Sequence, residues 1–169
     1  PPAAGDAVAR GAYLARAGDC VSCHTAPGGA PYAGGYKLDT PFGYLLAPNI
    51  TPDAATGIGR WSADDFYRAL HQGVNRKGQD MYPAMPFDFY TRITREDSDA
   101  LFAYLRSLSD VNNAVDINHL RFPFNKRWSM AVWRELYFSE GTYKNDPAKS
   151  AAWNRGAYLV EGLGHCSAC

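Results

Sequence analysis

Two short cysteine motifs hold the side chains of this sequence that are best suited to chemistry. In the first, Cys20 and Cys23 are separated by two residues and are followed directly by His24. Two thiols at this spacing on a helical turn point to the same side and can add to the two vinyl groups of one haem. A histidine directly after them can ligate the iron as the proximal ligand. The motif therefore predicts one covalently attached haem.

The surroundings of this motif bear on a second interpretation. A CxxC pair also occurs in thioredoxin-like redox proteins, where alternating strands and helices surround it. Here the pair follows a predicted helix and precedes residues 27–59, which are rich in Gly, Pro and Tyr. These aromatic loops are expected to wrap an apolar group, so the context favours haem attachment.

The second motif, Cys166 and Cys169, has no histidine after it within this chain. An internal repeat leads into both motifs, because Arg-Gly-Ala-Tyr-Leu at residues 10–14 recurs at residues 155–159. A repeat of this kind predicts tandem copies of one domain. We therefore expect residues 151–169 to be the truncated start of a second haem domain, packed as a helix with free or oxidised thiols.

All four cysteines together suggest a zinc site as another alternative. The 142 residues between Cys23 and Cys166 disfavour it.

The sixth iron ligand separates an electron carrier from a haem enzyme or gas sensor with an open distal site. The candidates are Met81, Met85, Met130, His71 and His119. Met85 lies in a Pro-rich loop between two predicted helices, from which a thioether can approach the distal face. Met81 is its main rival, with more polar neighbours, and either methionine can instead fill a gap in the core. We expect His71 to be partly exposed, and neither His119 nor Met130 to reach the haem.

Apolar periodicity and cap residues predict four helices before the second repeat, at residues 6–17, 62–73, 94–108 and 126–138. Ser62 with Asp65, and Thr94 with Asp97, form the capping-box pattern, in which each pair is joined by two reciprocal hydrogen bonds. Gly11 is expected to allow close approach of the helix at 94–108. Tyr13 or Leu14 is then expected to pack near that helix, against Leu101 and Tyr104.

The helix at 126–138 is expected to bury its apolar side chains, which are Trp128, Val132, Trp133, Leu136 and Tyr137. The predicted fold class is mainly α, with long Gly/Pro/Tyr-rich loops and a C-terminal helical extension. We assign residues 1–110 to the haem domain, 111–150 to a connector, and 151–169 to the start of a second domain.

Composition excludes several other functions. Seventeen basic and seventeen acidic side chains cancel, whereas a nucleic-acid-binding protein normally has a basic surplus. No apolar stretch approaches the ~20 residues that cross a bilayer, and no signal peptide is visible. Membrane association is therefore expected only through sequence not present here.

Three segments resemble a known family: Asn-Ile-Thr-Pro-Asp at 49–53, Thr-Gly-Ile-Gly-Arg-Trp at 56–61, and Tyr-Pro-Ala-Met-Pro-Phe at 82–87. The family is the multi-haem cytochrome c subunits of bacterial membrane-bound alcohol, gluconate, sorbitol and related sugar dehydrogenases. The resemblance implies the cytochrome c fold, one haem c in this chain, and His24 and Met85 as axial ligands. It also implies a periplasmic location at the cytoplasmic membrane, where electrons pass from a dehydrogenase subunit to ubiquinone or a terminal oxidase.

Arg60 and Trp61 are candidates for binding the haem propionates. A guanidinium is a bidentate donor and an indole has one N–H, and both suit partly buried carboxylates. Trp61 can also pack with Phe66 as a hydrophobic staple at the start of the second helix. The function predicted from the whole sequence is one-electron transfer without bond-making at a substrate, in a carrier rather than an enzyme.

Overall fold

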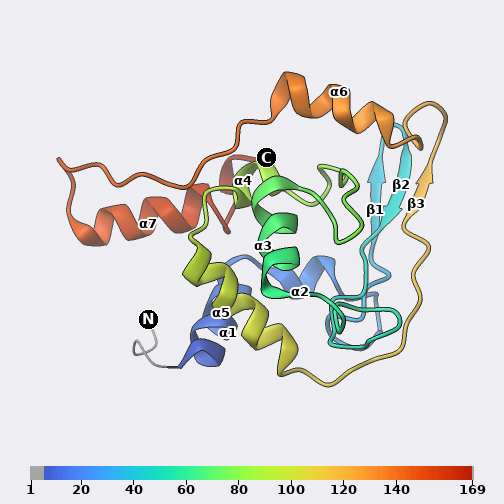
Figure 1. The fold of residues 1–169 in the computed structure, drawn as a ribbon, viewed down its shortest axis with the longest axis horizontal. Coiled ribbons are helices and arrows are strands. Elements are labelled where there is room, and N and C mark those ends of the chain that lie inside the picture. The colour runs from blue at the N-terminus through green and yellow to red at the C-terminus, as the bar shows by residue number, and fades with distance from the viewer. Residues whose placement is uncertain (1–5, 169) are drawn as a thin grey trace.

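The structure is a computed structural model that describes residues 6–168. The helices are α1 (Ala7–Ala17), α2 (Cys20–Cys23), α3 (Ala63–Gln72), α4 (Phe87–Tyr90), α5 (Arg95–Arg106), α6 (Trp128–Tyr137), α7 (Ala151–Glu161) and the 3-10 helix η1 (Cys166–Ala168). Three short strands, β1 (Lys37–Thr40), β2 (Gly43–Leu46) and β3 (Asn118–Leu120), form one antiparallel sheet in the order β1-β2-β3. The predicted mainly α class is confirmed (Figure 1). None of the described helices combines the length and apolarity needed to cross a membrane.

The crossing of α1 and α5 confirms the expectation for Gly11. A Cβ placed on Gly11 would lie 1.9 Å from the carbonyl oxygen of Ala100 and 2.6 Å from the Cβ of Tyr104. Only a glycine therefore lets the two backbones approach this closely. Leu14 is fully buried in the contact, whereas Tyr13 is exposed. Of the two predicted packing residues, Leu14 is thus the one that fills the core.

Helix α3 begins and ends as its sequence predicts. The Ser62 hydroxyl accepts from Asp65 N at 3.1 Å, and the Asp65 carboxylate accepts from Ser62 N at 3.0 Å. Gly73 ends the helix in the left-handed region, with φ of 63°. A side chain at Gly73 would meet the ring of Phe87, so the same glycine permits close packing of α4.

Helix α5 confirms only half of its predicted capping box. The Thr94 hydroxyl accepts from Asp97 N at 3.2 Å, as expected. The reciprocal bond from Thr94 N goes to the hydroxyl of Tyr158 at 2.9 Å instead. Asp97 points away from the cap and is bound by side chains of α1 and α7. The prediction failed because tertiary ion pairs compete with a local backbone bond for the same carboxylate.

The sheet was not predicted, since residues 27–59 and 111–125 were interpreted as loop and connector. Leu45 pairs with Leu38 of β1 and with Asn118 of β3, which brings the connector back onto the loop. Gly43 has φ of 125°, and a Cβ there would lie 2.5 Å from the carbonyl oxygen of His119. The strands are only three or four residues long, too short for a clear alternating pattern.

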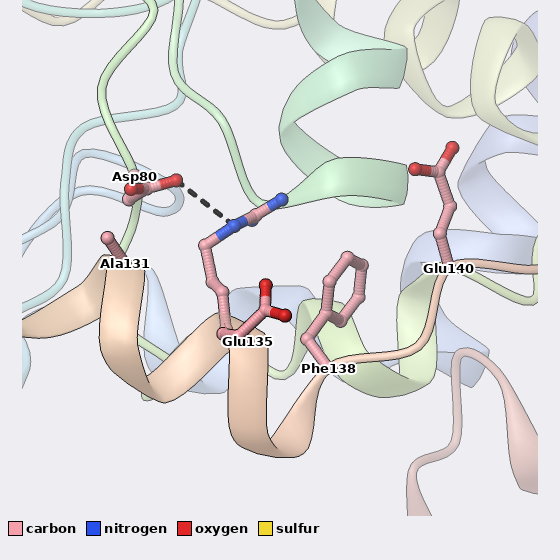
Figure 2. A pocket seen from close by; sticks show the side chains of 6 residues that line it. Asp80, Ala131, Glu135, Phe138 and Glu140 are labelled. Carbon is pink, nitrogen blue, oxygen red and sulfur yellow. Dashed lines mark ion pairs between the residues drawn. The ribbon is translucent and has the colours of Figure 1, made fainter.

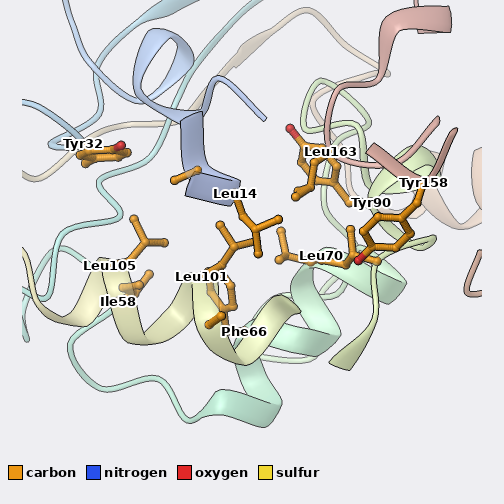
Figure 3. Packing of buried hydrophobic residues seen from close by; sticks show 13 residues of the cluster. Leu14, Tyr32, Ile58, Phe66, Leu70, Tyr90, Leu101, Leu105, Tyr158 and Leu163 are labelled. Carbon is orange, nitrogen blue, oxygen red and sulfur yellow. The ribbon is translucent and has the colours of Figure 1, made fainter. Parts of the chain in front are cut away.

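The main core lies where α1, α3 and α5 meet (Figure 3). Leu14 is surrounded there by side chains of the other two helices and of the polypeptide that follows α7, among them Phe66, Leu70, Leu101, Leu105 and Leu163. Cys20, Trp61 and Met85 are partly buried against this same cluster. A smaller cluster of Leu45, Tyr82 and Met130 lies between the sheet and α6.

Helix α6 has nearly the predicted bounds, but the prediction of its buried face was wrong. Trp128 is 61% exposed and Tyr137 is 69% exposed, and Val132 and Leu136 are exposed as well. Of the five side chains predicted for burial, only Trp133 packs inward, edge-on to Phe87. The opposite face of the helix is the one held against the body, through Arg127, Met130 and Arg134.

The inward arginines of α6 explain this orientation. Arg127 Nη1 donates to the Asp80 carbonyl oxygen at 2.5 Å, and Arg134 Nε lies 3.1 Å from the Asp80 carboxylate. Arg134 also donates to the Gln72 carbonyl oxygen and lies over the ring of Phe138. Two arginines beside carbonyl and carboxylate oxygens thus turn the helix so that its apolar stripe faces outward.

Candidate functional site

The first cysteine motif forms the single turn α2, directly after α1. Asp19 precedes α2 in the left-handed region with φ of 49°, and His24 N donates to the Cys20 carbonyl oxygen at 3.0 Å. Cys20 is half-buried and packs against the main core, whereas Cys23 is exposed. One helical turn therefore carries both thiols and ends at the histidine, as attachment to one planar macrocycle requires.

His24 is oriented by its own backbone environment. Its Nδ1 lies 2.8 Å from the carbonyl oxygen of Pro48. A carbonyl oxygen only accepts, so Nδ1 carries the proton and the lone pair of Nε2 is available to a metal. Burial also lowers the pKa of His24, which keeps the imidazole in the neutral form that binds metals. Pro48 is a functional residue that the motif alone did not indicate.

The two thiols differ from those of a redox-active cysteine pair. Burial raises the pKa of Cys20 to about 12, and burial together with the Asp19 carboxylate raises the pKa of Cys23. Thiol–disulfide enzymes instead lower the pKa of their attacking cysteine, because the thiolate is the nucleophile. With raised pKa values, Cys20 and Cys23 lack the activated thiolate of such enzymes.

Met85 and Met81 occupy different surroundings, although only four positions separate them. Met85 is partly buried against the main core, the cluster that Cys20 also contacts. Its carbonyl oxygen accepts from Phe87 N at 2.7 Å, which ties the loop to the start of α4. Met81 belongs to neither core cluster, and its N–H donates to the Gly73 carbonyl oxygen at 2.8 Å. Met85 therefore packs on the main core and Met81 does not, and the choice of iron ligand between them stays a prediction.

The remaining distal candidates are engaged elsewhere. Met130 is buried between the sheet and α6. His119 stacks on Tyr44 with ring centroids 4.5 Å apart. The prediction that His71 is partly exposed was wrong, because it is only 6% exposed. Its ring stacks on that of Tyr67, and its Nε2 lies 3.3 Å from the Glu140 carboxylate. It is buried because the polypeptide after α6 passes over the end of α3.

Arg60 and Trp61 follow a loop whose shape is fixed by polar contacts. Asn49 Oδ1 accepts from both the N–H and the hydroxyl of Thr51, and its Nδ2 donates to the Val111 carbonyl oxygen at 2.7 Å. Asn49 is thus an anchor of the loop, a role that its place in the segment 49–53 did not indicate. Trp61 is partly buried against the core, whereas Arg60 is exposed. Binding of propionates by these two residues stays a prediction.

The glycines of this loop explain its Thr-Gly-Ile-Gly sequence. A Cβ on Gly57 would lie 2.2 Å from the Thr51 carbonyl oxygen, and one on Gly59 would lie 2.3 Å from the Pro52 carbonyl oxygen. The two glycines therefore let the loop fold back on itself ahead of Trp61.

A pocket of about 350 Å³ lies away from these residues, beside α6 (Figure 2). Arg134, which is paired with Asp80, lines it together with Glu135, Phe138 and Glu140. It contains none of the predicted haem-binding side chains. Within residues 6–168, no group of three or more His, Cys, Asp or Glu side chains lies close enough together to hold a metal ion.

The residues of the first motif fit a covalently bound haem. Two neutral thiols lie on one turn, a neutral histidine has its Nδ1 proton fixed by a carbonyl oxygen, and a thioether packs on the core that one thiol contacts. Cys166 is exposed at the start of η1, and Cys169 lies outside the described residues. The structure thus assembles the first motif, while the second is described only in part.

Comparison with known proteins identifies the family of the chain. The family profile of cytochrome c matches residues 8–109. The chain is 52% identical over 160 residues to a subunit of nicotinate dehydrogenase from Pseudomonas putida, covering 95% of the chain and 14% of that protein. It is 45% identical over 164 residues to the gluconate 2-dehydrogenase cytochrome c subunit of Pantoea cypripedii, covering 96% of the chain and 37% of that subunit.

A third relative is the fructose dehydrogenase cytochrome subunit of Gluconobacter japonicus, 41% identical over 165 residues, which cover 96% of the chain and 34% of that subunit. The chain thus spans at most 37% of the length of these three relatives. Its haem-attachment motif, its mainly α fold and the match over residues 8–109 agree with one another. The chain belongs to the cytochrome c family, whose cofactor is covalently bound haem c.

Proposed function

We propose that this chain is a one-electron carrier, the first haem domain of a longer cytochrome c subunit that serves a membrane-bound dehydrogenase. The orientation of His24 carries the proposal, because its Nδ1–H···O=C bond to Pro48 prepares Nε2 for iron beside two thiols on one turn. When bound, haem supplies an iron that cycles between the ferric and ferrous states. The protein holds that group in place, orients the ligand and excludes water around it.

His24 and Met85 are the proposed axial ligands. Methionine ligation raises the reduction potential of a haem, which suits a carrier that receives electrons from a dehydrogenase. The packing of Met85 on the cluster that also touches Cys20 supports this choice over Met81. With Met85 as the sixth ligand the chain has no open site, which the alternative of a haem enzyme or gas sensor needs.

The relatives support the choice of partner, since they include gluconate and fructose dehydrogenase cytochrome subunits. The proposed donor is therefore a dehydrogenase catalytic subunit, and the proposed acceptor, after further haem domains of the parent chain, is ubiquinone or a terminal oxidase. The proposed location is the periplasm, at the cytoplasmic membrane. Residues 1–110 form the proposed haem domain, 111–150 the connector and 151–169 the start of the next domain.

Two matched variants, Met85→Ala and Met81→Ala, test the ligand assignment in the haem-loaded chain. The oxidised wild-type protein is expected to show the weak far-red absorption band of iron–sulfur ligation and to bind added cyanide slowly. Met85→Ala is expected to lose the band, bind cyanide rapidly and have a lower midpoint potential. Met81→Ala is expected to keep the wild-type values. A wild-type protein without the band, and with rapid cyanide binding, would favour the open-site alternative.

The haem count tests the domain proposal. Mass spectrometry of the loaded chain is expected to show one haem, lost when both Cys20 and Cys23 are replaced by Ser. Two haems per chain would show that Cys166 and Cys169 are also competent for attachment.

A further inference from the structure

Asp97, in the first turn of α5, is a buried carboxylate that serves two other helices. Its side chain is only 1% exposed. Arg10 of α1 reaches Oδ1 through Nε at 2.6 Å and Nη2 at 2.5 Å. From α7, Tyr158 donates its hydroxyl to Oδ2 at 2.7 Å, and Arg155 Nη1 lies 3.2 Å from the same oxygen. Both oxygens of Asp97 are therefore occupied by charged or hydroxyl donors.

The two arginines are the first residues of the two Arg-Gly-Ala-Tyr-Leu copies. Equivalent residues of the repeat, one from each copy, thus meet on a single carboxylate. The Tyr158 hydroxyl strengthens the junction, because it also accepts from Thr94 N at 2.9 Å and so completes the cap of α5. A buried carboxylate is costly unless it is paired and hydrogen-bonded, so removing a partner weakens the attachment of α7.

The polypeptide beyond α7 lies against the first haem motif. Leu163 is 1% exposed within the main core, and a Cβ on Gly18 would lie 3.3 Å from its carbonyl oxygen. The ring of His165 meets that of Tyr90 edge-on, with centroids 5.8 Å apart. Tyr90 is buried in the main core, the cluster against which Cys20 of the first motif also packs. Figure 3 shows Tyr90, Leu163 and Tyr158 together at this edge of the core.

We propose that Asp97, with Arg10, Arg155 and Tyr158, is a clamp that fixes α7 and the residues after it, as far as Cys166, beside the first haem site. The proposal rests on the function proposed above, in which the chain carries a haem at the first motif. The clamp residues are positioning residues, because they act through α7 on the place of Cys166. Held in this way, Cys166 keeps a constant separation from the first haem site.

A fluorophore on Cys166 reports this separation in the haem-loaded chain. Haem bound at Cys20 and Cys23 consumes both of those thiols, and Cys169→Ser leaves Cys166 as the one thiol for maleimide labelling. Haem quenches a nearby fluorophore by distance-dependent energy transfer. The clamped chain is expected to give strong quenching with a single short lifetime.

Arg155→Met, alone and with Tyr158→Phe, is expected to cause loss of quenching and a spread of longer lifetimes. Arg155→Lys, which restores a positive charge at the same place, is expected to recover part of the quenching. Arg95→Met is the matched control, because Arg95 of α5 forms its ion pairs with Asp64 of α3 and Asp99 of α5 and not with a residue of α7. It is expected to leave the lifetime unchanged.

The haem absorption spectrum, recorded on every sample, separates the two proposals. A chain without attached haem overturns the proposed function. A chain with normal haem absorption overturns the clamp if its label is unquenched, or if Arg155→Met with Tyr158→Phe leaves the lifetime as in the parent.

Discussion

Residues 10–14 in α1 and residues 155–159 in α7 have the same sequence and differ in what surrounds them. In α1 the stripe of Gly11 and Leu14 faces α5, and Tyr13 is exposed. In α7 the stripe of Arg155 and Tyr158 faces α5, and a Cβ on Gly156 would meet nothing within 4 Å. The same five residues therefore bury a different stripe in each copy, because the neighbouring helix presents a different surface to each.

The comparison separates two kinds of helix contact. The α1–α5 crossing is close and apolar, and depends on an absent side chain at Gly11. The α7–α5 contact depends on donors that reach one carboxylate. Arg10 takes part as well, so the first copy uses both kinds of contact and the second uses one. Matched substitutions at equivalent positions of the two copies can therefore measure each contact separately.

The largest difference in the free energy of unfolding is expected between substitutions of the two glycines, Gly11 and Gly156. Gly11→Ala places a Cβ 1.9 Å from a backbone oxygen of α5, so the helices must separate, at a cost of about 4 kcal/mol or more in the free energy of unfolding. Gly156→Ala meets no neighbour and should stabilise the helix by about 0.5–1 kcal/mol. Guanidinium unfolding of the haem-loaded variants measures both. Equal effects in the two variants would contradict the α1–α5 crossing.

The second largest difference in the free energy of unfolding is expected between the leucines of the two copies. Leu14 is fully buried, so Leu14→Ala should cost about 3 kcal/mol through lost burial and the cavity that remains. Leu159 is only partly buried at the edge of the core, and Leu159→Ala should cost about 1 kcal/mol. The same unfolding experiment applies. A Leu159→Ala variant as unstable as Leu14→Ala would show that α7 is packed more deeply than described.

Local signals explain how much of this arrangement could be predicted from sequence. Helix α3 carries its own start in Ser62 and Asp65 and its own end in Gly73, so its bounds followed from neighbouring residues. The CxxCH motif likewise contains both thiols and the histidine within five positions. Each of these features is determined by residues close together in the chain.

Features that depend on distant partners were not predictable in the same way. The pairing of β2 with β3 joins Leu45 to Asn118, and neither segment shows a strand pattern alone. Periodicity located α6 but could not show that Arg134 would turn its apolar stripe outward. Asp97 matched a capping box, and only the structure shows that arginines of two other helices take its side chain.

Replacing the arginine should destabilise the chain more in the first copy than in the second, because Arg10 makes the shorter contacts with Asp97. Arg10→Met removes two short contacts with Asp97 and should lower the free energy of unfolding by about 2 kcal/mol. This is less than the loss of a fully buried ion pair would cost, because the Arg10 guanidinium is partly exposed. Arg155→Met removes one longer contact and should cost about 1 kcal/mol. The double variant should lose more than the sum, since it leaves the carboxylate with Tyr158 alone. Strict additivity would contradict a shared buried carboxylate.

The two tyrosine variants should differ least in their free energy of unfolding. The pH dependence of that free energy shows whether the buried Tyr158 hydroxyl causes the difference. Tyr158→Phe removes the hydroxyl that binds Asp97 and Thr94 and should cost about 1 kcal/mol, whereas Tyr13→Phe should change little. Burial raises the pKa of Tyr158, so above pH about 10 the unfolded chain loses this proton while the folded chain keeps it. Stability therefore falls as pH rises in that range. Tyr158→Phe should reduce the alkaline slope of unfolding free energy, and a slope equal to that of Tyr13→Phe would place the Tyr158 hydroxyl in solvent.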